Sequence, residues 1–284
     1  GAGTDTVDID TDSSLTGASK VTLTNVEQVV LEASNNGGAF ATFDASGIAS
    51  LERITLSADS DDAAYSVTNL VDAATVRFLA EATTTAVTVD TAGTSVTLLT
   101  AGNTATTPTV SDAVTVNITA GDAATNDFSA VVLDDDVTTT LTLTGSTTDG
   151  ADLLTGNITG SNLLSSITAT TDTTGGLITV GTIVDGDALT SVVANADYGD
   201  ITFGALAGTG TAEGLATLTA TANNGATTTF GAITADTTDS TSDVTTTVTG
   251  TASTSGSTVA LGSLTSTYGI VNGTLSGPGV VGST

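Results

Sequence analysis

The chain of 284 residues contains no histidine, cysteine, methionine or tryptophan. Without histidine and cysteine, the nucleophile–base pairs of most hydrolases and the usual ligands of zinc and iron–sulfur centres are missing. A pair of carboxylates could still hydrolyse glycosides, but such chemistry normally takes place in sugar clefts lined with aromatic side chains. We therefore expect that the protein is not an enzyme.

Positive charge is equally scarce, because Lys20, Arg53 and Arg77 are the only basic residues. A nucleic-acid-binding protein needs a cluster of such residues to displace counterions from phosphates, and docking on an anionic membrane needs one as well. No run of the sequence approaches the roughly 18 apolar residues that a membrane-spanning helix requires. We expect no nucleic-acid partner and no insertion into a membrane.

Acidic residues, by contrast, number 31, and the formal net charge is −28. Repulsion among so many carboxylates opposes compaction unless cations relieve it. Calcium is scarce in the cytosol, whereas its concentration outside the cell fills even weak binding sites. The charge therefore favours an extracellular protein that is loaded with Ca²⁺.

The sequence has enough apolar surface to fold, since 39% of its residues are hydrophobic and the mean hydropathy is +0.30. These residues are mainly valine, leucine, isoleucine and alanine, and they are interleaved with many threonines. Branched side chains at alternating positions favour strands over helices. The pattern predicts an all-β protein, which strand ladders, packing or bound metal must hold together because disulfides are excluded.

A repeat of about 25 residues runs along the chain. Residues 25–33 align with residues 50–58 and share a glutamate, a leucine and an alanine at equivalent positions. In the second half, a glycine recurs ahead of a small residue and an aliphatic one. The recurrent glycines, which are 25, 23, 27 and 31 residues apart, are Gly156, Gly181, Gly204, Gly231 and Gly262.

This period, with two or three short strands in each repeat, predicts a parallel β-solenoid with coils of about 25 residues. Coils stacked about 4.8 Å apart would form a rod on the order of 50 Å long, and parallel crossovers prefer the right hand. Aliphatic residues would stack inside, threonine rows would face solvent, and each recurrent glycine would mark a corner that needs positive φ or close backbone approach. The competing architecture is a row of β-sandwich modules, which would need repeats nearer 100 residues and more core aromatics.

The acidic segment 134–155 interrupts the regularity of the repeat. We interpret it as an irregular loop or bend between one solenoid arm, residues 1–133, and a second arm, residues 156–284. The alternative is one continuous domain.

Several acidic segments are candidate calcium sites. Residues 1–7 match most of the G-G-x-G-x-D-x-U nonapeptide, in which glycine carbonyls and an aspartate bind Ca²⁺ between stacked coils. Three aspartates follow at alternate positions, so they would face one side of a strand. Acidic turns farther along offer the hard oxygen ligands that Ca²⁺ prefers, although solvated surface carboxylates are an alternative interpretation of each. The candidate ligands are Gly1, Gly3, Asp5, Asp8, Asp10, Asp12, Asp59, Asp61, Asp62, Asp134, Asp136, Asp185, Asp187, Asp197 and Asp200.

These features resemble those of bacterial S-layer proteins of the Caulobacter type and of RTX-associated calcium-binding surface proteins. The similarity rests on residues 1–7, on the segment FDASGI at residues 43–48, and on a composition rich in threonine, alanine, glycine and aspartate. It implies export by type I secretion, calcium-binding RTX repeats, and β-solenoids that assemble into a surface lattice.

Together these observations predict a structural subunit of an extracellular surface layer or filament on a bacterial cell. Ca²⁺ would be the bound ion, and further copies of the same chain would be the main partners, with cell-surface polysaccharide as a second candidate. The alternative function is the stalk or binding module of a type I-secreted RTX adhesin. Exposed aromatic clusters would favour that alternative, but the three tyrosines lie far apart in the sequence.

Overall fold

The structure of the protein is a computed structural model. It describes residues 3–11, 15–20, 22–33, 40–58, 64–79, 86–102, 106–133, 137–172, 174, 176–184, 188–207, 215–234, 245–265 and 270–283. Over these residues the regular secondary structure is almost entirely strand, and the only helical segment is the short 3-10 helix η1 (Ala45–Gly47). The expected all-β class is confirmed.

Two long parallel sheets run the length of the molecule. Sheet A has 12 strands in the described part of the chain, and each strand pairs with its counterpart in the next coil. Its strands, in spatial order, are β1 (Thr6–Thr11), β3 (Gln28–Ala33), β5 (Arg53–Ala58), β7 (Ala74–Leu79), β9 (Ser95–Ala101), β11 (Thr115–Ala120), β13 (Thr140–Thr144), β15 (Ser166–Thr171), β18 (Ser191–Asp197), β21 (Thr217–Asn223), β24 (Thr245–Ala252) and β27 (Ile270–Ser276).

Sheet B has 16 described strands, and four of these form a short side row in the second half of the chain. The main row is β2 (Leu15–Lys20), β4 (Phe40–Asp44), β6 (Ala64–Leu70), β8 (Ala86–Thr91), β10 (Thr107–Ser111), β12 (Thr125–Leu133), β14 (Asp152–Thr159), β16 (Leu177–Val180), β19 (Asp200–Phe203), β22 (Thr227–Phe230), β25 (Thr258–Leu261) and β28 (Val280–Ser283). The side row is β17 (Ile183–Val184), β20 (Leu206–Ala207), β23 (Ile233–Thr234) and β26 (Leu264–Thr265).

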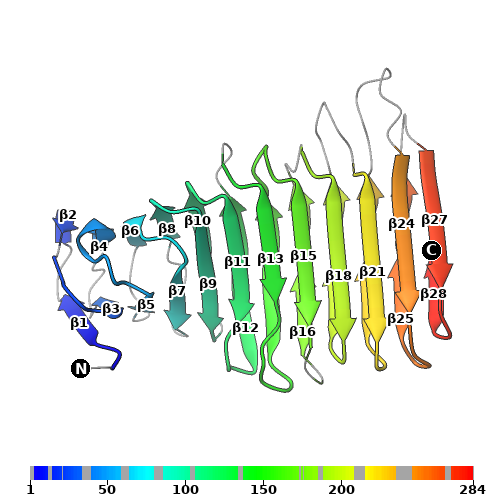
Figure 1. Cartoon of the computed structure of the whole chain (residues 1–284), viewed down its shortest axis with the longest axis horizontal. Helices are drawn as coiled ribbons and strands as arrows, with labels where there is room; N and C mark the ends of the chain where they lie inside the picture. Colours follow the sequence, from blue (N-terminus) through cyan, green and yellow to red (C-terminus); the bar gives the residue numbers. More distant parts are fainter. Residues whose placement is uncertain are drawn as a thin grey trace.

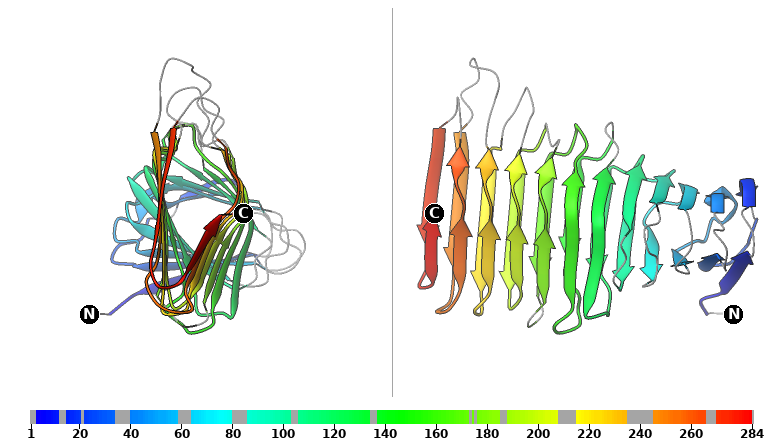
Figure 2. Two further views of the ribbon diagram at one scale, coloured as in Figure 1. Left: turned by 90° about the vertical axis from the view of Figure 1, so that its right-hand side faces the viewer. Right: turned by 180° about the vertical axis from the view of Figure 1, so that it is seen from behind.

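Apart from the strands of the side row, consecutive strands therefore alternate between the sheets, and the chain winds as a β-solenoid with coils of about 25 residues. Figure 1 shows the coils stacked side by side from the N-terminal end at the left to the C-terminal end at the right. The end-on view in Figure 2 shows the walls of the solenoid facing one another across its interior. Coil length varies along sheet A: Ser95 pairs with Thr115, 20 residues on, whereas Thr217 pairs with Thr247, 30 residues on.

The core consists of aliphatic rows that run along the axis. Strands such as β7 and β9 alternate strictly between buried and half-buried positions, as expected for a sheet with one covered face. Because the ladders are in register, each inward residue lies against its counterpart one coil away. One such row, with every member fully buried, is Val29, Ile54, Val76, Leu98 and Ile118. The predicted aliphatic stacks are confirmed.

Aromatic side chains reinforce the core at two places. Phe203 and Phe230, which pair on adjacent coils, stack with their ring centroids 5.0 Å apart and their planes 3° apart. Phe78 of sheet A meets Phe128 of sheet B edge-on, also with centroids 5.0 Å apart. Such ring pairs add to the free energy gained from burial alone, so these phenylalanines tie neighbouring coils and facing sheets together.

The recurrent glycines of the second half form a column in which successive coils touch backbone to backbone. An added Cβ on Gly204 would lie 2.8 Å from the carbonyl carbon and oxygen of Gly181, and one on Gly231 would lie 2.8 Å from the carbonyl oxygen of Gly204. Neither Gly204 nor Gly231 has positive φ. Of the two reasons that the repeat suggested for glycine here, close backbone approach is therefore the one that applies.

Both sheets continue through residues 137–155. β13 joins β11 to β15 in sheet A, and β14 joins β12 to β16 in sheet B. The structure thus describes an uninterrupted ladder at the place where the sequence left open a bend between two arms or one continuous domain. Asp134 and Asp136 lie outside the described residues.

The glycine column gives a direct test of the coil contacts. We expect Gly204→Ala to destabilise the fold by about 1–3 kcal/mol, because its Cβ would force two backbones apart. Gly273→Ala is the matched control, since an added Cβ there meets nothing within 4 Å, and its effect should stay within about 0.5 kcal/mol. Urea unfolding followed by circular dichroism measures both, and equal losses would show that the contact does not matter.

Candidate functional site

Many of the predicted calcium ligands lie outside the described residues. Asp10 belongs to β1, but its side chain is also outside the described set. The other predicted ligands that are not described are Gly1, Asp12, Asp59, Asp61, Asp62, Asp134, Asp136, Asp185 and Asp187.

Of the first predicted site, the structure describes Gly3, Asp5 and Asp8. Gly3 and Asp8 are both exposed, and Asp8 lies opposite Val30 of the next coil. Asp5 is held by its main chain: its N–H donates to Glu27 Oε2 over 2.8 Å, and its carbonyl accepts the N–H groups of Glu27 and Gln28. The main chain of Asp5 thus starts the ladder between β1 and β3.

Asp197 and Asp200 bind groups of the next coil through their side chains. Asp197 Oδ1 accepts a hydrogen bond of 2.6 Å from Asn224 Nδ2, and Asp200 Oδ1 accepts one of 2.6 Å from the main-chain N–H of Thr227. Asp152, which the sequence reasoning did not single out, accepts the N–H of Leu177 in the same way over 3.0 Å. These carboxylates cap strands or turns of the following coil.

Asp152 and Asp200 also border one shallow cavity of about 270 Å³ with the exposed Tyr198. Asp152 lies on β14 and Asp200 lies on β19, and both of these strands pair with β16. The two aspartates are therefore two coil steps apart. Their Cα atoms are thus separated by roughly 10 Å, because neighbouring strands lie about 4.8 Å apart.

Asp72, in the turn before β7, accepts four hydrogen bonds from two residues of the next coil. Its Oδ1 accepts the main-chain N–H groups of Ser95 and Thr94 at 2.8 and 2.9 Å and both of their hydroxyls at 3.1 Å. The N–H of Ser95 contributes most to holding the pKa of Asp72 below its ordinary value, followed by the hydroxyl and N–H of Thr94. An ionised Asp72 therefore orders the start of β9 on the next coil.

One pair of carboxylates faces each other without such support. Asp90 lies near the end of β8, and Asp112 follows β10 one coil later with a φ of 62°. Burial raises the pKa of Asp90, and its hydrogen bond with Asp112 and the charge of Asp112 raise it further. The sequence reasoning missed this pair because neither residue belongs to an acidic run; their separation of one coil was the only available signal.

Within the described residues, no group of three or more acidic side chains is placed to hold a metal ion. The same residues include no helix that is both long and apolar enough to span a membrane. Ca²⁺ prefers six to eight oxygen ligands, so the Asp90–Asp112 pair supplies only part of a coordination shell, and carbonyls or water would have to supply the rest.

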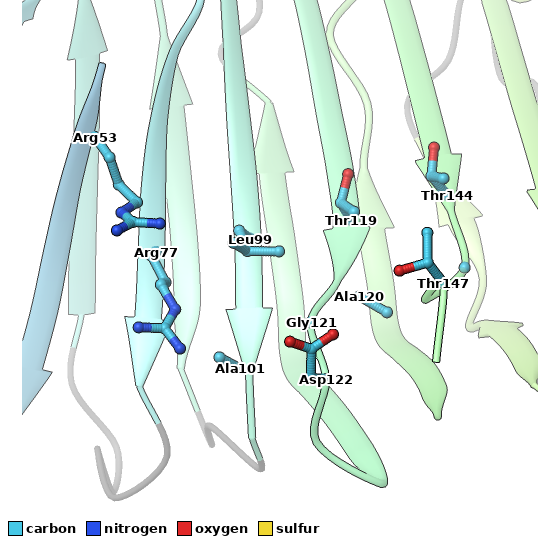
Figure 3. Close-up of a pocket in the computed structure, with 11 residues that line it drawn as sticks. Arg53, Arg77, Leu99, Ala101, Thr119, Ala120, Gly121, Asp122, Thr144 and Thr147 are labelled. Carbon is cyan, nitrogen blue, oxygen red and sulfur yellow. The ribbon is translucent and has the colours of Figure 1, made fainter. Parts of the chain in front are cut away.

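A second kind of site is a cavity of about 420 Å³ on the outer face of sheet A. Figure 3 shows Arg53 and Arg77 along one side of it, on adjacent strands, and Leu99 and Ala101 on the next strand. Asp122 lies on the opposite side, in the turn after β11. The cavity thus gathers two of the three cations of the whole chain.

Comparison of the chain with protein-family models, with curated proteins and with solved structures found no match. The assignment of a function therefore rests on the fold and on the sites described above.

We expect Asp90→Asn and Asp72→Asn to change stability in opposite directions at neutral pH. The raised pKa of Asp90 means that its ionised form opposes folding, so Asp90→Asn should raise the urea midpoint at pH 7, and the gain should vanish below pH 3.8, the ordinary pKa of an aspartate. The lowered pKa of Asp72 means that its ionised form supports folding. Asp72→Asn should therefore lower the midpoint at pH 7, and the loss should shrink as the pH falls below 3.8. Shifts of the same sign in both variants would contradict this account.

Proposed function

We propose that this protein is a structural subunit of an extracellular surface layer or filament on a bacterial cell, with a β-solenoid that Ca²⁺ stabilises. The observation that carries the proposal is the uninterrupted parallel ladder, in which both sheets run through the described chain from its first coil to its last. Coils that are bonded to both neighbours along a continuous core form a rigid spacer. Such a rod suits a load-bearing or lattice-forming role.

The chemistry of the side chains supports a scaffold. Carboxylates such as Asp72 and Asp200 bind main-chain N–H groups of the next coil, so these acidic residues serve the stacking of the rod. The chain also lacks the histidine and cysteine on which most catalytic sites depend. We therefore include in the proposal that the protein is not an enzyme.

The charge of −28 supports an extracellular location and a role for Ca²⁺. Each carboxylate that faces another, as Asp90 faces Asp112, opposes stacking until a cation or a proton neutralises it. A divalent cation at such places would stabilise one rod, and between two rods it would bridge acidic surfaces of neighbouring copies. The partners in this proposal are accordingly further copies of the chain.

The second candidate function, a stalk or binding module of a type I-secreted RTX adhesin, is favoured by the cavity on sheet A. A spacer that also carries a recognition site would present the two arginines on its side. Under this alternative the rods stay separate in solution, whereas under the first they assemble.

We expect millimolar Ca²⁺ to raise the thermal midpoint of the purified chain and to produce ordered sheets or filaments in electron micrographs. The comparison sample contains EGTA and enough NaCl to match the ionic strength, which separates ion binding from general screening. Asp90→Asn should show a smaller Ca²⁺-dependent rise than the wild type. The matched control Asp149→Asn, in an exposed turn, should keep the full rise.

Each outcome is informative about one part of the proposal. Equal midpoints and equal assemblies with Ca²⁺ and with EGTA would show that calcium has no structural role. A rise in midpoint without any assembly would favour the adhesin module over the lattice subunit.

A further inference from the structure

The concentration of positive charge at the cavity on sheet A is unusual for so acidic a chain. Arg53 pairs with Thr75 and Arg77 pairs with Thr55, which places the arginines diagonally on adjacent strands of the outer face. Diagonal neighbours in a sheet lie within reach of each other's long side chains, and like charges there repel. Arg53 donates through Nη2 to Gln28 Oε1, while its buried Nε–H has no acceptor among the described residues.

The lining of the cavity changes along the following coils, from arginines to small or aliphatic side chains and then to hydroxyl-bearing and acidic ones. One outward row runs from Arg77 to Leu99, then to Thr119 and Thr144, each paired with the next. Ala101 widens the floor beside Leu99, and both side chains are partly exposed. The far side offers the hydroxyls of threonines and the carboxylate of Asp122, whose Oδ1 accepts a hydrogen bond from Thr148 Oγ1.

We propose that this cavity binds a sugar acid, a ring that carries one carboxylate together with several hydroxyls. The carboxylate would lie against Arg53 and Arg77, because guanidinium groups form paired, charge-assisted hydrogen bonds with carboxylates. The C–H face of the ring would cover Leu99 and Ala101, and the ring hydroxyls would reach Thr119 and Asp122, which follow on the next coil (Figure 3). The volume of about 420 Å³ lies within the range of small-molecule sites.

Two features select this class of ligand over other anions. Asp122 repels a second negative charge on the far side of the cavity but accepts a hydrogen bond from a hydroxyl. The overall charge of −28 disfavours polyanions such as nucleic acids and phosphorylated glycans, because repulsion grows with the charge of the ligand. The inference goes beyond the scaffold role and holds whether or not the rods assemble.

The test is a calorimetric titration of the full chain with galacturonate, using galactose and inorganic phosphate as comparison ligands. Galacturonate should bind, and Arg77→Gln should weaken its binding about tenfold or more, as expected for one lost charge-assisted contact. Ala101→Phe, which fills the floor, should weaken binding similarly without removing a charge. Lys20→Gln removes the same charge from β2 of sheet B and should leave the affinity unchanged.

The proposal is overturned if galacturonate does not bind at millimolar concentration, or if Arg77→Gln or Ala101→Phe binds it as the wild type does. It is also overturned if galactose or phosphate binds as tightly as galacturonate, since the site would then lack the proposed selectivity. An oligosaccharide of neutral sugars that ends in a single galacturonate distinguishes a glycan from a free sugar acid as the source of the ligand, because it carries the same single charge as galacturonate. Tighter binding of the oligomer identifies an acidic glycan, whereas equal or weaker binding identifies the free sugar acid.

Discussion

The parallel, in-register ladder of main-chain hydrogen bonds between coils is the constraint on which the rest of this structure depends. It fixes the spacing of the coils at that of neighbouring strands, about 4.8 Å. Every side chain must therefore be compatible with its counterpart one coil earlier and one coil later. The aliphatic row from Val29 to Ile118 and the stacked rings of Phe203 and Phe230 satisfy this requirement inside the solenoid.

The same constraint explains the glycine column and the capping carboxylates. Where two backbones approach more closely than a Cβ permits, as at Gly181 and Gly204, only glycine is compatible with the stacking. Where a strand begins, its first N–H groups need acceptors, and Asp72 and Asp200 supply them from the preceding coil. An acidic side chain on the outside of this rod can thus be part of the ladder.

The register of the ladder also brings side chains of like charge close together. It brings Asp90 against Asp112 and Arg53 near Arg77, and neither arrangement stabilises the coil stack. Proteins tend to carry destabilising arrangements of side chains at their functional sites. The acidic pair accordingly bears on the proposed role of Ca²⁺, and the arginine pair bears on the proposed sugar acid.

The sequence by itself determined the β class, the coil length of about 25 residues, the aliphatic interior and the need for glycine at the recurrent corner. All of these follow from local periodicity and from the alternation of side chains along a strand. Only the tertiary structure decided which distant residues meet. Coils of 20 to 31 residues change the pairing from one step to the next, so the average period does not reveal that Asp112 faces Asp90 or that Leu99 follows Arg77. Contacts between coils depend on exact register, and register is set jointly by each turn and by the packing of the core.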